Sequence, residues 1–372
     1  MKKIILILAI LYLQVLHLNA QNLIAVQNVG QSTFYSNIDS AITYAQAGDT
    51  IYFPGGNFNL GSYRYVIHKR LYLIGAGHNL DSCQATGITY ISGNIDLEDS
   101  ADGSMLAGIY LTGDIYIGDG FSVSPTAGGV GDVKSITITR CNIGSVFGNY
   151  SANGSCCGCY SNINLSNYLI NENVIRGNIN GVDGNGNLFA NNIIEGTVQS
   201  LGQNSFQNNI FLYEGNYPGG LFSYHPIGEV RNAVVKDNIF ISTTLTIGGS
   251  GVCTYMNNAS NSNFLNNLFV ETVSSPYCSS CLDYNNYSGV SPVSLFINQS
   301  GNVFSYGQNY HLQNPLLYSG TDGTQVGIYG GMFPWKEGSS PFNPHISYQS
   351  IPSNTNANGN LPVNIRIQAQ DH

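Results

Sequence analysis

A short phrase recurs along the chain, in which an asparagine precedes aliphatic or aromatic residues. It occurs seven times, with its asparagines at Asn142, Asn173, Asn192, Asn209, Asn238, Asn267 and Asn302. The two shortest spacings are 19 and 17 residues, which is close to one coil of a parallel β-solenoid. The longer spacings fit a coil with an inserted loop, or a coil that lacks the phrase. Self-similarity of this kind predicts a repeat architecture in which each coil stacks on the next.

The chemistry of the phrase suits a stacked corner. Asparagine tolerates the left-handed backbone of a tight corner, and stacked asparagine side chains can hydrogen-bond along a ladder. The apolar residues after it begin a short strand, and stacked strands bury a core that no single coil can bury. An asparagine-rich set of β-turns in a sandwich is the alternative. We predict an all-β fold, a single-stranded right-handed parallel β-helix with the seven asparagines in a structural ladder.

Both ends of the chain differ from the repeats. Residues 22–27 read as a strand, and residues 37–46 have apolar residues at helical spacing, which predicts a helix that caps the open end of the solenoid. After Gly331 the chain is punctuated by prolines, and residues 361–369 alternate apolar and polar positions, as in a last strand. The predicted organisation is a signal peptide (1–20), a β-helix with its N-terminal cap (21–331) and a proline-rich C-terminal tail with a final strand (332–372).

Two phrases follow the predicted helix, GDTIYFPGGNF at residues 48–58 and LYLIGAG at residues 71–77. Together with the helix they resemble the opening of right-handed parallel β-helix proteins of the pectate-lyase-like superfamily. The phrase DGTQVGIYGG at residues 322–331 resembles the one that closes the β-helix in many secreted bacterial members. The resemblance spans about residues 30–331 and implies the fold. It implies no single activity, because the superfamily contains lyases, hydrolases, epimerases and adhesins.

The first 20 residues have the parts of an export signal. Lys2 and Lys3 precede an apolar run over residues 4–13, and Leu18-Asn19-Ala20 suits cleavage. A membrane anchor is the alternative, but the run is short for a span, and no other segment is long and apolar enough. We expect a bacterial protein that is secreted or held at the cell surface, monomeric, with no membrane span after cleavage.

The low charge content narrows the partners. Charged residues make up 9% of the chain, against about 25% in a typical domain. The formal net charge is −9, and it becomes −11 once Lys2 and Lys3 are removed. An acidic surface argues against nucleic acid. It argues more weakly against a polyanionic polymer such as pectate, unless metal ions bridge the two.

Eight cysteines in an exported protein predict disulfides. Their number allows many pairings, so none is assigned. The clusters at residues 156–159 and 278–281 have zinc ligation as the alternative, although no histidine lies beside either. The cysteines are Cys83, Cys141, Cys156, Cys157, Cys159, Cys253, Cys278 and Cys281.

Polysaccharide cleavage would require carboxylates at equivalent places on adjacent coils. The repeats do not give this pattern convincingly. Glu195 could share a face with Arg176 of the preceding coil, either as a catalytic pair or as a surface ion pair. Asp183 begins Asp183-Gly184-Asn185-Gly186-Asn187, which has oxygen ligands at alternate positions like a calcium loop, but Leu188 and Ile194 replace its Gly and Glu. A glycine corner is the alternative there, and we expect no cofactor, with calcium as the one option.

Aromatic residues gather in an insertion at residues 213–231. Aromatic faces beside a few polar groups suit sugar rings, and such loops could form the wall of a groove. Packing of these rings onto the coils is the alternative, and His225 could also act as a base. The candidate ligand-binding residues are Tyr213, Tyr217, Phe222, Tyr224 and His225.

These observations favour a secreted or surface-displayed protein that binds a polysaccharide or cell-surface glycan without catalysis. A polysaccharide lyase or glycoside hydrolase acting in a groove on the β-helix face is the alternative. A purely structural spacer is a third reading. Three or more converging acidic and basic side chains would favour the enzyme, whereas a floor of Asn, Ser and Tyr would favour binding.

Overall fold

The computed structural model describes most of the chain in eleven stretches. These are residues 23–61, 64–118, 133–148, 165–180, 184–212, 227–241, 256–257, 260–270, 280–338, 340–342 and 344–369. The predicted signal peptide, Asp183 and the aromatic candidates at residues 213–225 lie outside these stretches.

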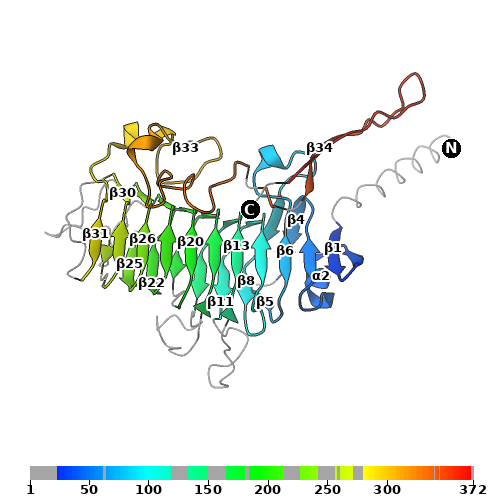
Figure 1. The fold of residues 1–372 in the computed structure, drawn as a ribbon. Coiled ribbons are helices and arrows are strands. Elements are labelled where there is room, and N and C mark those ends of the chain that lie inside the picture. The colour runs from blue at the N-terminus through cyan, green and yellow to red at the C-terminus, as the bar shows by residue number, and fades with distance from the viewer. Residues whose placement is uncertain are drawn as a thin grey trace, which may run out of the picture.

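Three long sheets make up the body of the molecule (Figure 1). Sheet A has 12 strands, in the order β2 (Gln31–Tyr35), β1 (Ile24–Asn28), β3 (Thr50–Tyr52), β6 (Tyr72–Ile74), β9 (Met105–Ala107), β13 (Thr137–Thr139), β17 (Leu169–Asn171), β20 (Leu188–Ala190), β23 (Ser205–Gln207), β26 (Val234–Lys236), β29 (Asn263–Leu265) and β31 (Leu282–Tyr284). Its pairs are parallel from β3 onward, whereas β1 is antiparallel to both β2 and β3.

The other two long sheets are entirely parallel. Sheet B has nine strands, β4 (Gly56–Asn59), β7 (Thr89–Ser92), β10 (Tyr110–Leu111), β14 (Asn142–Ile143), β18 (Val174–Ile175), β21 (Ile193–Ile194), β24 (Ile210–Phe211), β27 (Ile239–Phe240) and β30 (Leu268–Phe269). Sheet C has eight, β5 (Tyr65–Ile67), β8 (Ile95–Leu97), β11 (Ile115–Ile117), β15 (Val146–Gly148), β19 (Ile179–Asn180), β22 (Val198–Gly202), β25 (Ile227–Arg231) and β28 (Met256–Asn257).

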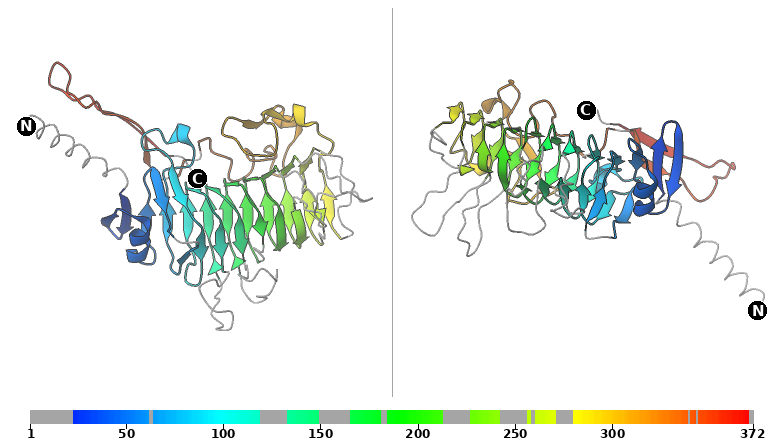
Figure 2. Two further views of the ribbon diagram at one scale, coloured as in Figure 1. Left: turned by 180° about the vertical axis from the view of Figure 1, so that it is seen from behind. Right: turned by 90° about the horizontal axis from the view of Figure 1, so that it is seen from below.

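Consecutive strands visit sheets A, B and C in turn, and the chain then returns to sheet A one strand further along. We call each such set of three strands a coil. Figure 2 shows the strands of successive coils side by side along the molecule, with β1 and β2 at one end. The prediction of an all-β fold with long parallel sheets is confirmed.

The remaining elements are short. Helix α2 (Ile38–Tyr44) lies in the region where a capping helix is predicted, and Asn37 caps it by accepting a hydrogen bond of 2.7 Å from Ser40 N. Ile38, Ala41 and Ile42 are buried in the main core. The others are β12 (Val133–Lys134) with β16 (Leu165–Ser166), β32 (Phe296–Asn298) with β33 (Asn309–Leu312), β34 (His345–Ser350) with β35 (Asn364–Gln368), and the 3₁₀ turns η2 (Leu80–Ser82), η3 (Pro292–Ser294) and η4 (Pro315–Leu317).

Identical side chains stack through the core from coil to coil. The Phe240 ring lies between those of Phe211 and Phe269, with ring centroids 4.6 Å and 4.8 Å apart and nearly parallel planes. These separations match the distance of about 4.8 Å between neighbouring strands. Aliphatic residues occupy the same position in the earlier coils, so one apolar column runs through the stack.

Asparagines form a second column inside the corner between sheets A and B. Each accepts hydrogen bonds through Oδ1 from the asparagine of the preceding coil and donates through Nδ2 to the next, at 2.9–3.0 Å. Its second Nδ2 hydrogen is donated to a backbone carbonyl, for example from Asn209 to Phe189 O. All these polar groups are thereby paired in a buried position. The ladder comprises Asn173, Asn192, Asn209, Asn238, Asn267 and Asn286.

Two predicted ladder positions are wrong. Asn142 pairs with Val174 in register and so lies one residue past the ladder, where Cys141 N donates to Asn173 Oδ1. Asn302 lies outside the coils, between β32 and β33. Asn286, which ends the ladder, has no strand after it, and the repeated phrase therefore missed it.

The left-handed backbone belongs to a different residue from the one predicted. The residue before each ladder asparagine has a positive φ of 50–60°, and the ladder asparagines themselves do not. We call these residues, together with Arg140, the corner row. The corner row comprises Arg140, Glu172, Asn191, Asn208, Asp237, Asn266 and Asn285.

We expect Asn209→Ala to lower the free energy of unfolding by about 3–5 kcal/mol. The substitution leaves the Asn192 side chain, the Asn238 Oδ1 and a buried carbonyl without their partner, at about 1–3 kcal/mol for each unsatisfied group. Urea denaturation measures the change. Asn302→Ala is the matched control and should stay within about 0.5 kcal/mol of the parent. Equal losses in both variants would contradict the assignment of the ladder.

Candidate functional site

The C-terminal part of the chain returns along the outside of the coils. We call residues 319–338 and 340–341 the strap. Corner-row side chains bind its backbone one after another, as the strap runs back toward the N-terminal coils (Figure 1). The contacts run from Asn266 with Ser319 O through Asp237 with Thr321, Asn208 with Gln325 O and Gly327 O, and Asn191 with Ile328 O and Gly330 O, to Arg140 with Ser340 O.

The phrase at residues 322–331 therefore lies in the strap. Gly327 N donates to Asp237 O, and two carbonyls of the phrase accept from Asn208. Gly331 has a φ of +76°, and a Cβ there would lie 2.3 Å from Asn208 Oδ1. The last strand of sheet A is instead β31, which ends at Tyr284. Gly331 is required for this close approach of strap and corner.

A second apolar cluster fixes the segment before the strap. We call residues 292–318 the cover. Leu295, Phe296, Tyr310 and Leu312 of the cover are buried together with the outward residues of sheet B. These outward residues are Ile193, Ile210, Leu212, Ile239, Ile241, Leu268 and Val270. The outer face of sheet B is closed over its C-terminal coils.

The outer face of sheet B carries mainly polar and aromatic residues in the N-terminal coils. In register with Ile193 and Ile210, the earlier strands carry Val174, Asn142, Tyr110 and Tyr90. Strand alternation places Thr112, Ser92 and Asn59 on this face as well. Figure 1 shows the cover and β33 over the C-terminal coils, away from β4. We call Asn57, Asn59, Tyr90, Ser92, Tyr110, Thr112, Asn142 and Arg176 the tyrosine strip.

The two tyrosines and Arg176 form the centre of the strip. The Tyr90 and Tyr110 rings stack at 5.2 Å with an interplanar angle of 11°. The Arg176 guanidinium lies 4.9 Å from the centroid of the Tyr110 ring. It also donates to Ile143 O at 3.2 Å and to the carbonyls of Leu111 and Thr112. These bonds hold the cation over the ring, as in cation–π pairs.

The predicted pair of Arg176 and Glu195 lies on one face, as the sequence suggests, but each side chain has other partners. Glu195 Oε1 accepts a hydrogen bond of 2.7 Å from Phe304 N, which fixes the cover to the coils. Burial raises the pKa of Glu195, while the Phe304 N–H and the Arg176 charge act in the opposite direction. In this arrangement Glu195 anchors the cover, and Arg176 supports Tyr110.

Tyr306, a residue of the cover, closes one end of the strip at Asn142. Its hydroxyl accepts from Asn142 Nδ2 at 3.1 Å and lies 2.7 Å from His78 Nδ1 and 2.9 Å from His78 O. Within the described part of the chain, His78 Nε2 and Asn142 Oδ1 are buried without a hydrogen-bond partner. Burial lowers the pKa of His78 to about 3, so the ring is neutral and exchanges hydrogen bonds only. Two unpaired polar atoms at one end of the strip favour a polar ligand or an ordered water there.

Sheet C carries a second cluster, which the sequence reasoning missed. Asp96 on β8 is fully buried, and Arg64 Nη1 lies 3.6 Å from its Oδ2. Glu98, two residues later, lies 3.7 Å from His68 Nδ1. Burial, followed by the Glu98 charge, raises the pKa of Asp96 to about 7, against the opposing effect of Arg64. Four ionisable side chains thus converge on neighbouring strands.

The Asp96 carboxylate is unusual for a buried acid. Among the described residues neither of its oxygens has a hydrogen-bond partner, although the Arg64 charge lies nearby. The Arg64 guanidinium also lies 3.5 Å from the centroid of the Tyr116 ring. A carboxyl group with a pKa near neutrality can hold and release a proton at physiological pH, which is the property that a general acid needs.

A sequence signal existed for both clusters. Asp96 stands between Ile95 and Leu97 in a strand of period two, where an aliphatic or neutral residue would be ordinary. Tyr90 and Tyr110 are 20 residues apart, which is one coil. Both positions become visible only once the register of the coils is known.

The described stretches contain neither a cluster of metal-ligand side chains nor a helix that could span a membrane. Within them, no group of three or more His, Cys, Asp or Glu side chains is placed to hold a metal ion. No helix of these stretches combines the length and the apolar character that crossing a membrane requires. The calcium interpretation of Asp183 lies outside them.

The predicted disulfides are tested only at a few positions. Cys83 and Cys141 are buried free thiols, and burial raises the pKa of each to about 12. Cys141 belongs to the main apolar core, and Cys83 is buried at the end of η2. Cys281 is disulfide-bonded. The remaining cysteines lie outside the described residues.

Comparisons with known proteins give no relative. No protein-family model matches the sequence, and neither a curated protein nor a solved structure is similar to it.

Proposed function

We propose that the protein is a secreted or cell-surface right-handed parallel β-helix of the pectate-lyase-like superfamily, and that it binds a polysaccharide or cell-surface glycan without catalysis. The single observation that carries the proposal is the floor of the tyrosine strip, which consists of Asn, Ser, Thr and Tyr side chains beside one arginine. Amide and hydroxyl groups pair with sugar hydroxyls, and tyrosine rings pack against the apolar CH faces of sugars. The order of coils lets one glycan chain lie across several of them.

Three features support binding on this strip. Tyr90 and Tyr110 are rigidly stacked, so little side-chain entropy is lost on binding. The apolar residues of the cover pack on the aliphatic coils, whereas Asn57 and Asn59 at the other end of the strip are exposed. Arg176 is held by three carbonyls, which fixes a donor and a positive charge beside the ring.

Tyr110→Ala should weaken glycan binding about tenfold. Loss of an aromatic contact of this kind is worth about 1.4 kcal/mol or more. Affinity electrophoresis through gels that contain one neutral or acidic polysaccharide each measures the retardation. Tyr284→Ala is the matched control, because Tyr284 is 60% exposed on β31 at the far end of sheet A. Unchanged retardation of Tyr110→Ala, with the parent protein retarded, would exclude the strip.

A polysaccharide lyase or hydrolase is the second candidate function. Its specific support is the pair of Asp96 and Glu98, with Arg64 and His68 beside them. The Glu98 charge acts on Asp96, so the two carboxyl groups lie close together, and glycoside hydrolysis uses a pair of carboxyl groups. Purified protein would be incubated with a panel of polysaccharides, with and without calcium. New reducing ends or unsaturated products, absent with Asp96→Asn, would favour this candidate over pure binding.

A further inference from the structure

A polar cleft lies at the N-terminal end of the molecule, away from the tyrosine strip. It has a volume of about 370 Å³, between the β1–β2 hairpin and the end of helix α2. This volume is within the range of small-ligand sites, at its lower end. The lining residues are Val26, Asn28, Val29, Gln31, Thr33, Tyr35, Tyr44, Gln46 and Asp49.

Strand register explains the composition of the hairpin wall. Val26 pairs with Thr33, and Asn28 pairs with Gln31, so these side chains share one face of the antiparallel pair. Phe34, the next residue of β2, points to the other face. On the helix side, the Tyr44 ring stacks on Tyr35 at 6.0 Å with an interplanar angle of 10°.

The polar groups of the cleft are positioned by each other. Asn28 Nδ2 donates to Gln46 Oε1 at 3.2 Å, which joins the hairpin to the end of the helix. Gln46 N donates to Asp49 Oδ2 at 2.8 Å. Asp49 is only 6% exposed, and that bond is the one its carboxylate makes within the described residues. Its Oδ1 is therefore a fixed acceptor at the bottom of the cleft.

We infer that this cleft is a second saccharide site, which binds a neutral sugar residue. The tyrosine pair offers a flat apolar surface, and Gln31, Thr33 and Asn28 offer donors and acceptors. The Asp49 Oδ1 can accept a charge-assisted hydrogen bond from a sugar hydroxyl. A negatively charged sugar is disfavoured by Asp49, because no cationic residue lines the cleft in the described structure. The site does not depend on the strip, and the two together would let one molecule hold two glycans.

Saturation-transfer NMR on the full chain, with a panel of neutral mono- and disaccharides, tests the inference. We expect at least one neutral sugar to bind, and Tyr44→Ala to weaken that binding at least tenfold. Asp49→Asn should weaken it several-fold, since the amide retains the shape but loses the charge. Tyr44 is 70% exposed, so its removal leaves folding nearly unchanged.

Phe34→Ala is the matched control, because Phe34 is 62% exposed on the opposite face of the same strand. It should bind the sugar as the parent does. Tyr110→Ala should also leave this binding intact while it weakens retardation by the polymer, which separates the cleft from the strip. The inference is overturned if no neutral sugar binds, or if Tyr44→Ala binds as tightly as Phe34→Ala.

Discussion

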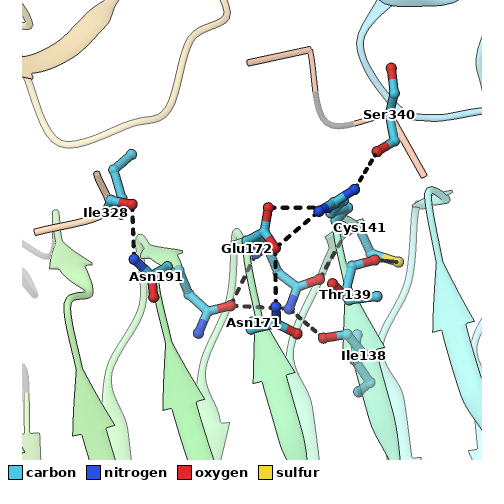
Figure 3. A network of polar contacts seen from close by, with 11 residues as sticks. Ile138, Thr139, Cys141, Asn171, Glu172, Asn191, Ile328 and Ser340 are labelled. Carbon is cyan, nitrogen blue, oxygen red and sulfur yellow. Dashed lines mark hydrogen bonds and ion pairs between the residues drawn. The ribbon is translucent and has the colours of Figure 1, made fainter. Parts of the chain in front are cut away.

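Replacing Arg140 by methionine should lower the free energy of unfolding by about 3–5 kcal/mol. Arg140 Nε and Nη2 donate to the Glu172 carboxylate at 3.1 Å and 3.4 Å, and Nη1 donates to Ser340 O of the strap (Figure 3). Arg140 and Glu172 are both buried. Breaking such a pair leaves the buried Glu172 carboxylate without its largest counter-charge, and the charge and backbone N–H of Lys336 offset the cost of burial only in part. Asn171 Nδ2, which also donates to Glu172, does not replace the lost charge.

Urea denaturation followed by two signals measures the effect. Far-ultraviolet circular dichroism reports the sheets, and the fluorescence of Trp335, the single tryptophan, reports the strap. Trp335 N donates to Ile328 O, and its ring is packed against the second apolar cluster. In Arg140→Met the fluorescence transition should precede the circular dichroism transition, because the strap loses a contact that the coils do not share.

The double variant Arg140→Met/Glu172→Met is the control for charge burial. Replacement of a whole buried pair by apolar residues is often neutral or stabilising, so most of the lost stability should return. A double variant as unstable as Arg140→Met would mean that the hydrogen bonds, rather than the uncompensated charge, carry the effect.

The coils were predictable because their signal is local and repeated. Asn192 and Asn209 lie one coil apart in sequence, and the aliphatic residue after each is buried, so composition and spacing suffice. The repeated phrase gives a wrong ladder assignment where its asparagine is not in register with the ladder asparagines. Asn142 is followed by Ile143 as the others are by their strands, yet it stands one position beyond the ladder.

The corner row and the strap were not predictable in this way. Glu172 and Asp237 each precede a ladder asparagine, and nothing local in the sequence distinguishes their roles. Their function depends on residues more than 80 positions away, since Asp237 binds Thr321 and Glu172 binds Arg140, which holds Ser340. The backbone of the strap supplies most of the partners, and backbone groups leave no trace in composition.

The residues of the tyrosine strip could not be predicted for a related reason. Arg176 and Glu195 stand out because charges are rare in this chain, but both are used in holding Tyr110 and the cover. Tyr90 and Tyr110 are two of 25 tyrosines and stand out only in register. In a sequence with few charges, the charged residues are readily chosen as site candidates, although here they anchor other groups. The neutral residues of the candidate binding surface cannot be identified without the register.

Raising the pH from 5 to 8 should destabilise the protein through Asp96. The pKa of Asp96 is raised from 3.8 to about 7 in the folded state. Between these values the folded state retains a proton that the unfolded state releases, so stability falls as the pH rises through this window. The two pH units between pH 5 and the folded pKa of about 7 correspond to at most about 3 kcal/mol. Above pH 7 the charged carboxylate is buried with only Arg64 to oppose the cost of desolvation.

Asp96→Asn should remove this pH dependence, because the amide keeps the shape of the side chain without titrating. At pH 8 the variant should unfold at higher urea concentration than the parent, and this difference should shrink as the pH is lowered to 5 and vanish only below the unfolded pKa of 3.8. Asp81→Asn, at an exposed position of η2, is the control and should change stability by less than about 0.5 kcal/mol at either pH. Parallel pH profiles for Asp96→Asn and the parent would show that Asp96 is ionised at neutral pH in the folded state.

The same variant also separates the two candidate functions. A buried acid that lowers stability at neutral pH is best explained by a functional use of its proton, because proteins trade stability for activity at functional sites. If the sheet C cluster cleaves glycosidic bonds, Asp96→Asn loses product formation, gains stability at pH 8 and keeps its retardation in glycan gels. If the protein only binds glycans, Asp96→Asn gains stability and its retardation stays that of the parent, with no products from either. Loss of retardation in Asp96→Asn would instead place the glycan on sheet C and contradict the assignment of binding to the tyrosine strip.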